Sequence, residues 1–353
     1  MNHKKNIIKE LVSLGRFLSQ FSTEKPSRCP TIANNNIFFD GFIDQLKLAS
    51  KFNGWFTKEN ICFALKQWSE LLKEKSLVQW LSNYPNSNSQ PKTIALIMAG
   101  NIPLVGFHDF LACIVTGHNI IIKQSSNDRH LLPFIVSYLI HEASLIKSKI
   151  KFVDNKIEKF DAVIATGSNN TARYFNAYFK NKPSIIRNNR NSIAILSGNE
   201  SENDLKNLSN DIFRYYGLGC RSVSKIYVPK NYDFDMLFKA VYKWNPVINI
   251  RKYLNNYDYN KAVYIMSEFD IIENGFLMLK EDRRLSSPIA TLFYEYYDNV
   301  SELKSKLKAI SSEIQCIVAN GFNSKEIKFG STQSPTLKDY ADGVDTVDFL
   351  LKI

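Results

Sequence analysis

The stretch TIALIMAGNIPLVGFHDFLACIVTGHNIIIKQSS (93–126) decides the fold. Its two apolar runs, TIALIMAG (93–100) and NIIIK (119–123), are typical of short buried strands. Between them, LVGFHDFLACIVT (104–116) has helical spacing and is followed by Gly117, a residue favoured just after a helix. Two buried strands joined by a helix predict a parallel pair with a crossover connection.

The same alternation continues along the chain. We expect a helix in SSNDRHLLPFIVSYLIHEASLIK with Ser126 as its cap, and a strand in DAVIATG (161–167). A helix in SNNTARYFNAYFK (168–180) and strands near SIIRN and SIAILSG (192–198) follow. The pattern predicts an α/β fold with a parallel sheet covered by helices on both faces. Such sheets bind ligands beyond the carboxyl ends of their strands.

The flanking regions complete the expected organisation. Residues 1–90 predict helices and loops, with a polar, Pro-containing break at 82–92. A second α/β unit begins near residue 201. We expect a helical part and a Rossmann-like cofactor-binding domain over 1–205 and a catalytic domain over 206–325. The segment 326–353 would return to the cofactor domain or form an interface.

Composition excludes several classes of protein. The chain has 353 residues, of which 44% are hydrophobic and 22% charged, so it can build cores and is not a low-complexity chain. Its most apolar stretch is interrupted by polar residues and proline, so we expect no integral membrane segment. The net charge of +11 fits either an anionic ligand or simple solubility, and no nucleic-acid-binding motif is present.

Five cysteines without a CxxC pair argue against a disulfide framework and against a structural metal site. They fit a reducing compartment, and the N-terminal pattern is not that of a signal peptide, so we expect a cytoplasmic protein. Cys220 stands out because GLGCRS (217–222) places it between two glycines at a helix–strand junction, where Arg221 and Lys225 would favour the thiolate. The alternative is a small buried hydrophobic residue, which is the interpretation for the other four cysteines.

Polar residues after the strands are the other candidates. Asn101 could donate to an oxyanion or merely shape a turn. Lys123 could meet ribose or phosphate or end a strand in solvent. Gly167 and Ser168 open a helix, where free N–H groups favour phosphate. We interpret His108, next to Asp109, as structural, and DYADGVD (339–345) as turns or charged contacts.

Taken in order, these pieces resemble the aldehyde dehydrogenase superfamily. The resemblance lies in AGNIPL, IIIKQSS, ATGSNNT and FRYYGLGCRSVSK. In the last, the nucleophile segment, Phe213, Gly217, Cys220, Ser222 and Lys225 match, whereas Leu218 departs. More narrowly, the chain is similar to the acyl-CoA reductase family, typified by the LuxC-type fatty acyl reductase of bacterial luminescence. GNIPLVGFHDFLACIVTGH, YYGLGCRS, LSSPIA and QSPTLKDYADGVDTVDFL carry that likeness.

The resemblance implies a Rossmann-like cofactor domain plus an α/β catalytic domain. It implies NAD(P)H-dependent reduction of a long-chain fatty acyl-CoA to the aldehyde through a thioester on Cys220. Asn101 and the Cys220 N–H would stabilise the oxyanions. The cofactor would contact Lys123, Ser125, Ser126, Gly167 and Ser168. The alternatives are a CoA-acylating aldehyde dehydrogenase, a reductase of another activated acyl donor, and a basic binding protein that has lost catalysis.

Departures from the superfamily pattern refine these expectations. Arg187 or Asn188 stands where the oxidising enzymes carry a general-base Glu, and Arg284 lies near the place of their ribose-binding Glu. Ser126, three residues after Lys123, replaces a carboxylate that would repel a 2′-phosphate, so NADPH is favoured, with NADH as the alternative. We also expect a homo-oligomer, acyl-CoA as substrate, an acyl-activating partner enzyme and no nucleic-acid partner.

Overall fold

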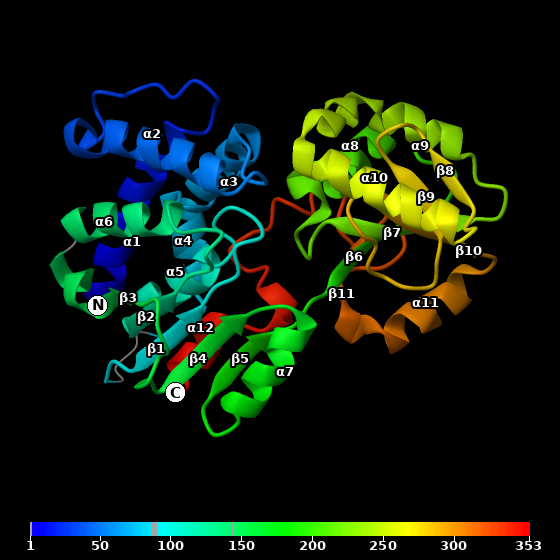
Figure 1. Ribbon diagram of the computed structural model, residues 1–353. Coiled ribbons are helices and arrows are strands. Elements are labelled where there is room, and N and C mark those ends of the chain that lie inside the picture. Colours follow the sequence, from blue (N-terminus) through cyan, green and yellow to red (C-terminus); the bar gives the residue numbers. More distant parts are fainter. Residues whose placement is uncertain (1, 86–89, 143) are drawn as a thin grey trace. The chain divides into compact units, whose positions relative to one another are not determined.

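The computed structural model describes residues 2–85, 90–142 and 144–353 (Figure 1). The chain divides into two compact units. The first unit comprises Met1–Asn188 together with Thr336–Ile353, and the second comprises Asn189–Pro335. Each unit is built around its own sheet, so each is described by itself.

The sheet of the first unit is parallel throughout, with strand order β3-β2-β1-β4-β5. The chain builds β1, β2 and β3 outward in one direction and then returns to place β4 on the other side of β1. This reversal is the topological switch point at which open α/β sheets bind ligands. The strands are β1 (Thr93–Ile97), β2 (Asn119–Lys123), β3 (Ile150–Phe152), β4 (Ala162–Thr166) and β5 (Ser184–Arg187).

Both faces of this sheet are covered because side chains alternate along each strand. In β1, Ile94 and Leu96 enter a large core with α1, α5 and α6, whereas Ala95 enters a smaller core with Phe175 and Phe179 on the side of α7 (Figure 1). The helices are α1 (Asn2–Ser19), α2 (Asn35–Phe52), α3 (Lys58–Leu71), α4 (Glu74–Leu81), α5 (Phe107–Thr116), α6 (Leu131–Glu142), α7 (Asn169–Tyr178) and α12 (Thr346–Leu351). Short 3₁₀ turns lie at Ser144–Lys149 and Ala341–Gly343.

The C-terminal tail belongs to the first unit. Val347 and Leu350 of α12 are fully buried in the large core. The Arg187 guanidinium at the end of β5 donates to both carboxylate oxygens of Asp109 in α5, to the Ala341 carbonyl and to the Thr346 hydroxyl. This buried network ties β5, α5 and the tail together.

The sheet of the second unit has strand order β11-β6-β7-β10-β9-β8, and of its pairings only β8 with β9 is antiparallel. Ile193 and Ile195 of β6 pack against Leu303 and Leu307 of α11. The strands are β6 (Asn191–Ile195), β7 (Val223–Pro229), β8 (Ile271–Glu273), β9 (Met278–Glu281), β10 (Thr291–Tyr297) and β11 (Ile314–Val318). The helices are α8 (Glu202–Phe213), α9 (Phe234–Val241), α10 (Arg251–Met266) and α11 (Val300–Ala309), with 3₁₀ turns at Arg214–Gly217, Tyr242–Asn249 and Ser311–Glu313.

The main sequence-based expectations are confirmed. The α/β architecture with parallel sheets is present, β2 occupies 119–123, and Gly117 ends α5 with φ 82°. The unit boundaries differ from the expected 205/206 and 325/326, because β6 pairs with β7 and β11 and therefore belongs to the second unit. Of the expected break at 82–92, residues 86–89 lie outside the described part of the chain.

Two further interpretations can be compared with the structure. Ser126 does not cap α6, which begins at Leu131, so that expectation was wrong. The structural interpretation of His108 is confirmed, since the ring is partly buried beside Trp80 and Tyr340 and its Nε2 lies 3.1 Å from the Leu337 carbonyl. Across the described residues, no helix combines the length and apolar character needed to cross a membrane.

Candidate active site

The first part of the candidate site is the segment 98–106, here called the Asn101 turn, which follows β1. Gly100 is required there, because a Cβ would lie 2.7 Å from the Cβ of Ser125. Leu104 has φ 57°, a left-handed conformation that costs a non-glycine residue about 1–3 kcal/mol. Asn101 itself is exposed. The turn is therefore a strained connection whose shape depends on its neighbours.

The second part follows β2. Lys123 pairs with Ile97 in the sheet register, so the ends of β2 and β1 lie side by side. The Ser125 hydroxyl accepts the Asn127 N–H at 3.2 Å. Ser126 is exposed in a turn and is not part of a helix. The structure thus places Ser125 against the Asn101 turn and leaves Ser126 accessible.

The third part follows β4, the other neighbour of β1. Ser168 is the N-cap of α7, and its hydroxyl accepts the Thr171 N–H at 3.3 Å. A Cβ on Gly167 would lie 2.9 Å from the side chain of Thr171, so glycine permits the close approach of α7 to the strand end. The N–H groups of the first helical turn favour an anion at this place.

The structure brings these three parts to one edge of the sheet and adds a groove beside them. The groove encloses about 590 Å³. It is apolar and aromatic with two lysines, and no carboxylate occurs among the described residues that line it. These are Ile97, Lys123, Lys156, Ile157, Tyr174, Phe175, Ala177, Tyr178 and Phe179. The Lys156 ammonium lies 5.4 Å from the centre of the Tyr178 ring.

Sequence reasoning missed Lys156 and the aromatic side of α7. A usable signal was present, because Tyr174 and Tyr178 lie four residues apart and therefore share one helix face. Both are exposed, at 76% and 57%, whereas Phe175 of the same helix packs against the smaller core. Exposed aromatic rings next to a basic strand end are a surface that can stack on a planar heterocycle.

Cys220 lies in the second unit, in the turn between α8 and β7. The turn begins with three consecutive left-handed residues, Tyr215, Tyr216 and Gly217, of which both tyrosines are buried. Left-handed conformations of this kind in bulky residues persist only where packing imposes them, and they cluster at functional sites. Cys220 is partly exposed, and its carbonyl accepts the Ser192 hydroxyl at 2.9 Å.

A distant segment holds this turn in place. Asp211 of α8 is fully buried and accepts the N–H of Gly330 at 2.6 Å and the N–H and hydroxyl of Thr332 at 2.9 and 2.8 Å. The Thr332 carbonyl in turn accepts Arg221 Nε at 2.6 Å, directly after Cys220. Sequence reasoning missed this connection, which spans more than a hundred residues of chain.

The expected role of Lys225 beside the nucleophile was wrong. Its ammonium is buried and lies 2.6 Å from the Glu295 carboxylate, so its charge is already paired. Arg221 Nε donates to the Thr332 carbonyl, a neutral acceptor that leaves the charge of the guanidinium in place. Cys62, Cys113 and Cys316 are buried, as expected, whereas Cys29 is partly exposed, so the buried interpretation was wrong for Cys29. Burial raises the pKa of Cys62 and Cys113. No cluster of His, Cys, Asp and Glu in the described ranges has the arrangement of a metal site.

Comparison with known proteins assigns the chain to a family. The profile of the acyl-CoA reductase (LuxC) family matches residues 40–237, which include Asn101, Lys123 and Cys220. The chain belongs to the acyl-CoA reductase (LuxC) family. No curated protein matches the sequence of this acyl-CoA reductase family member.

Solved structures show the same fold at low sequence identity. Aldehyde dehydrogenase 21 from Physcomitrella patens, in complex with succinate, is 10% identical, with a TM-score of 0.66 over 97% of this chain and 84% of its own. An indole-3-acetaldehyde dehydrogenase from P. syringae, in complex with NAD⁺ and IAA, is 12% identical, with a TM-score of 0.63 over 91% and 73% of the two chains. This LuxC-family chain therefore has the aldehyde dehydrogenase fold.

In this acyl-CoA reductase family member, the structure shows the surroundings of Arg187 and Arg284, the two arginines that depart from the superfamily pattern. Arg187, at the position where the oxidising enzymes carry a general-base Glu, is 4% exposed, and its guanidinium is paired with the Asp109 carboxylate. Arg284 is exposed and paired with Asp282 through two contacts of 3.0 and 2.6 Å. Asn101 and the groove belong to the first unit and Cys220 to the second.

Proposed function

We propose that this protein reduces a long-chain fatty acyl-CoA to the corresponding aldehyde, with NADPH as the preferred reductant and Cys220 as the nucleophile. The observation that carries the proposal is Cys220 itself. It is a partly exposed cysteine on a strained turn, within the residues matched by an acyl-CoA reductase family. Strain and exposure together are uncommon for a cysteine that serves only for packing.

The reaction divides into two steps at Cys220. Its thiolate attacks the thioester carbonyl, CoA leaves as its thiol after taking a proton, and an acyl thioester remains on the Cys220 sulfur. A nicotinamide cofactor, when bound, would supply the hydride that reduces this thioester. Asn101 and the Cys220 N–H would donate hydrogen bonds to the carbonyl oxygen as it becomes negative. Expulsion of the Cys220 thiolate then releases the aldehyde.

The groove at the carboxyl edge of the first sheet fits a dinucleotide. Tyr174, Phe175 and Tyr178 offer rings and apolar surface for a planar base, and the N-terminus of α7 offers N–H groups for phosphate. Lys123 and Lys156 supply two positive charges to the same groove. An extra phosphate on the ribose would find cations there, and no carboxylate among the described residues of the groove, which supports NADPH over NADH.

The residue at the place of the general base supports reduction over oxidation to a free acid. In the aldehyde dehydrogenases that this chain resembles, a glutamate there activates water. Here the guanidinium of Arg187 is buried against Asp109. A cation already paired in this way cannot accept a proton from water, so the Cys220 thioester would be protected from hydrolysis.

Replacing Cys220 by serine tests the proposal. We expect the purified wild-type chain to oxidise NADPH in the presence of acyl-CoA, across a panel from acetyl-CoA to palmitoyl-CoA, with the highest kcat/KM for long chains. Without cofactor, intact mass spectrometry should show one added acyl group. Cys220→Ser should abolish both signals, whereas Cys29→Ser, which alters the other partly exposed cysteine, should retain them.

Two results would contradict the proposal. Acylation of Cys220→Ser at the wild-type level would remove Cys220 as the nucleophile. Wild-type protein that neither oxidises NADPH nor accepts an acyl group from any member of the panel would leave another activated acyl donor, or a binding role, as the better account.

A further inference from the structure

A buried carboxylate lies beneath the Asn101 turn. Asp128 is 7% exposed, follows β2, and accepts the Leu104 N–H through Oδ2 at 3.2 Å. Its other oxygen, Oδ1, is fully buried and makes no hydrogen bond of normal geometry with the described residues. The Leu131 N–H at the start of α6 also favours the charged carboxylate. Buried carboxylate oxygens are normally satisfied, so an exception calls for an explanation.

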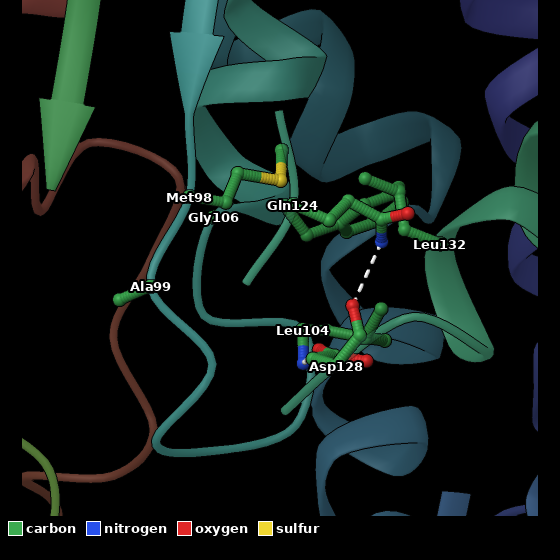
Figure 2. A pocket seen from close by; sticks show the side chains of 8 residues that line it. Met98, Ala99, Leu104, Gly106, Gln124, Asp128 and Leu132 are labelled. Carbon is green, nitrogen blue, oxygen red and sulfur yellow. Dashed lines mark hydrogen bonds between the residues drawn. The ribbon is translucent and has the colours of Figure 1, made fainter. Parts of the chain in front are cut away.

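The side chains around Asp128 are mostly apolar. Its carboxylate borders a cavity of about 10 Å³, the size of one water molecule (Figure 2). Among the described residues that line it, Asp128 is the one that carries a charge; the others are Met98, Ala99, Leu104, Gly106, Phe107, Gln124 and Leu132. The neighbouring Arg129 is directed to Asp154, at 3.7 Å. Burial raises the pKa of Asp128 to about 6, so the group changes charge near neutral pH.

Asp128 acts on the strained residue of the turn. Leu104 has φ 57°, and its N–H donates to the carboxylate while its carbonyl accepts the Phe107 N–H. Figure 2 also shows a contact within the segment after β2, in which the Gln124 side chain donates to the Asp128 carbonyl at 2.9 Å. Asn53 adds longer contacts to the carbonyls of Gly100 and Asn127, at 3.4 and 3.3 Å. The Asp128 carboxylate is therefore the charged group among the contacts that hold the segment carrying Asn101.

We propose that Asp128, in its charged form, is the positioning residue that holds the Asn101 turn in its catalytic conformation, and that protonation of this carboxylate releases the turn. A neutral carboxylic acid is a weaker acceptor than a carboxylate. Its own O–H would face apolar side chains. The inference rests on the proposed function, in which Asn101 donates to the oxyanion.

Kinetics of Asp128→Asn test the inference, because asparagine has the same shape without the charge. Wild-type kcat should fall as the pH is lowered through about 6. Asp128→Asn should have a kcat at pH 8 that is about tenfold lower, a smaller loss than the roughly 10²–10³ expected on removing an oxyanion donor. It should keep the wild-type KM for NADPH and acyl-CoA and lack the acid limb. Asp44→Asn, an exposed carboxylate on α2, is the matched control and should behave as wild type.

A measurement on the wild-type chain separates this inference from the proposed function. In ¹⁵N-leucine-labelled protein, the Leu104 amide resonance, assigned by its loss in Leu104→Met, should titrate with a midpoint near pH 6. A Leu104 resonance that does not move between pH 5 and 8 would overturn the inference, even if the variant fails to fold. So would wild-type kcat and an unchanged acid limb in Asp128→Asn. Absence of reductase activity with a normal Leu104 titration would instead overturn the proposed function.

Discussion

Replacing Asp211 by asparagine should loosen the turn that carries Cys220. The carboxylate makes three hydrogen bonds to the distant residues Gly330 and Thr332. Thr332 then accepts Arg221, next to the nucleophile. Asparagine keeps one acceptor oxygen. If that oxygen faces Thr332, two bonds remain, and the Gly330 N–H meets an amide NH₂ group that cannot accept it.

The expected magnitude follows from that loss. A hydrogen bond to a charged group contributes about 1.5–3 kcal/mol, and leaving the Gly330 N–H buried without an acceptor adds to the cost. We therefore expect Asp211→Asn to reduce the free energy of unfolding of the second unit by about 2–4 kcal/mol. For a unit of this size, that lowers Tm by roughly 5–15 °C. We also expect kcat to fall about tenfold, because small displacements of a nucleophile slow the reaction strongly.

The assay combines thermal unfolding with kinetics. Circular dichroism should show the lower Tm, and steady-state rates should show the loss in kcat with an unchanged KM for NADPH. The pH dependence of the rate at which iodoacetamide alkylates Cys220 should also differ between Asp211→Asn and the wild type. Asp298→Asn removes an exposed carboxylate paired with Lys230 in the same unit and serves as the control.

A pair of conservative variants guards against a purely structural effect. Thr332→Ser keeps the hydroxyl that donates to Asp211 and should preserve kcat, whereas Thr332→Val removes it and should lower both Tm and kcat. Equal behaviour of the serine and valine variants, or a wild-type Tm and alkylation profile in Asp211→Asn, would refute the reasoning.

Three further predictions concern the first unit. Asn101→Ala should lower kcat by roughly 10²–10³ with little change in KM, and a change confined to KM would show ground-state binding instead. Ser126→Glu should lower kcat/KM for NADPH more than for NADH, whereas equal use of both cofactors by the wild type would refute the assigned preference. Asp109→Asn should destabilise the first unit at pH 7 by about 3–5 kcal/mol in urea unfolding, because it leaves the Arg187 guanidinium buried without its partner. Although burial opposes ionisation, Arg187 holds the pKa of Asp109 below its usual value. The wild type should therefore lose this stabilisation as the pH falls below about 4, and the variant should show a weaker acid dependence.

Much of the fold could be predicted because its signals are local. The apolar runs of β1 and β2 and the glycine after α5 each lie within a few residues of the structure they specify. The start of α6 at Leu131 was also readable in principle. Pro133 is tolerated in the first turn of a helix, where its missing N–H has no partner to lose, but not in the interior of a helix that begins at Ser126.

The candidate site likewise has residues that could be predicted from local sequence and contacts that could not. The sequence alone determined the chemical groups that follow the strands, Asn101, Lys123 and Ser168, and the unusual surroundings of Cys220, because residue type and spacing along the chain identify them. Only the tertiary structure decided which groups hold these in place. Asp128 meets Leu104, and Asp211 meets Thr332, through contacts between segments that are far apart in the chain. The partner of a buried carboxylate depends on which N–H group folding brings within hydrogen-bond distance after water is excluded. A local sequence pattern specifies neither the burial nor the donor.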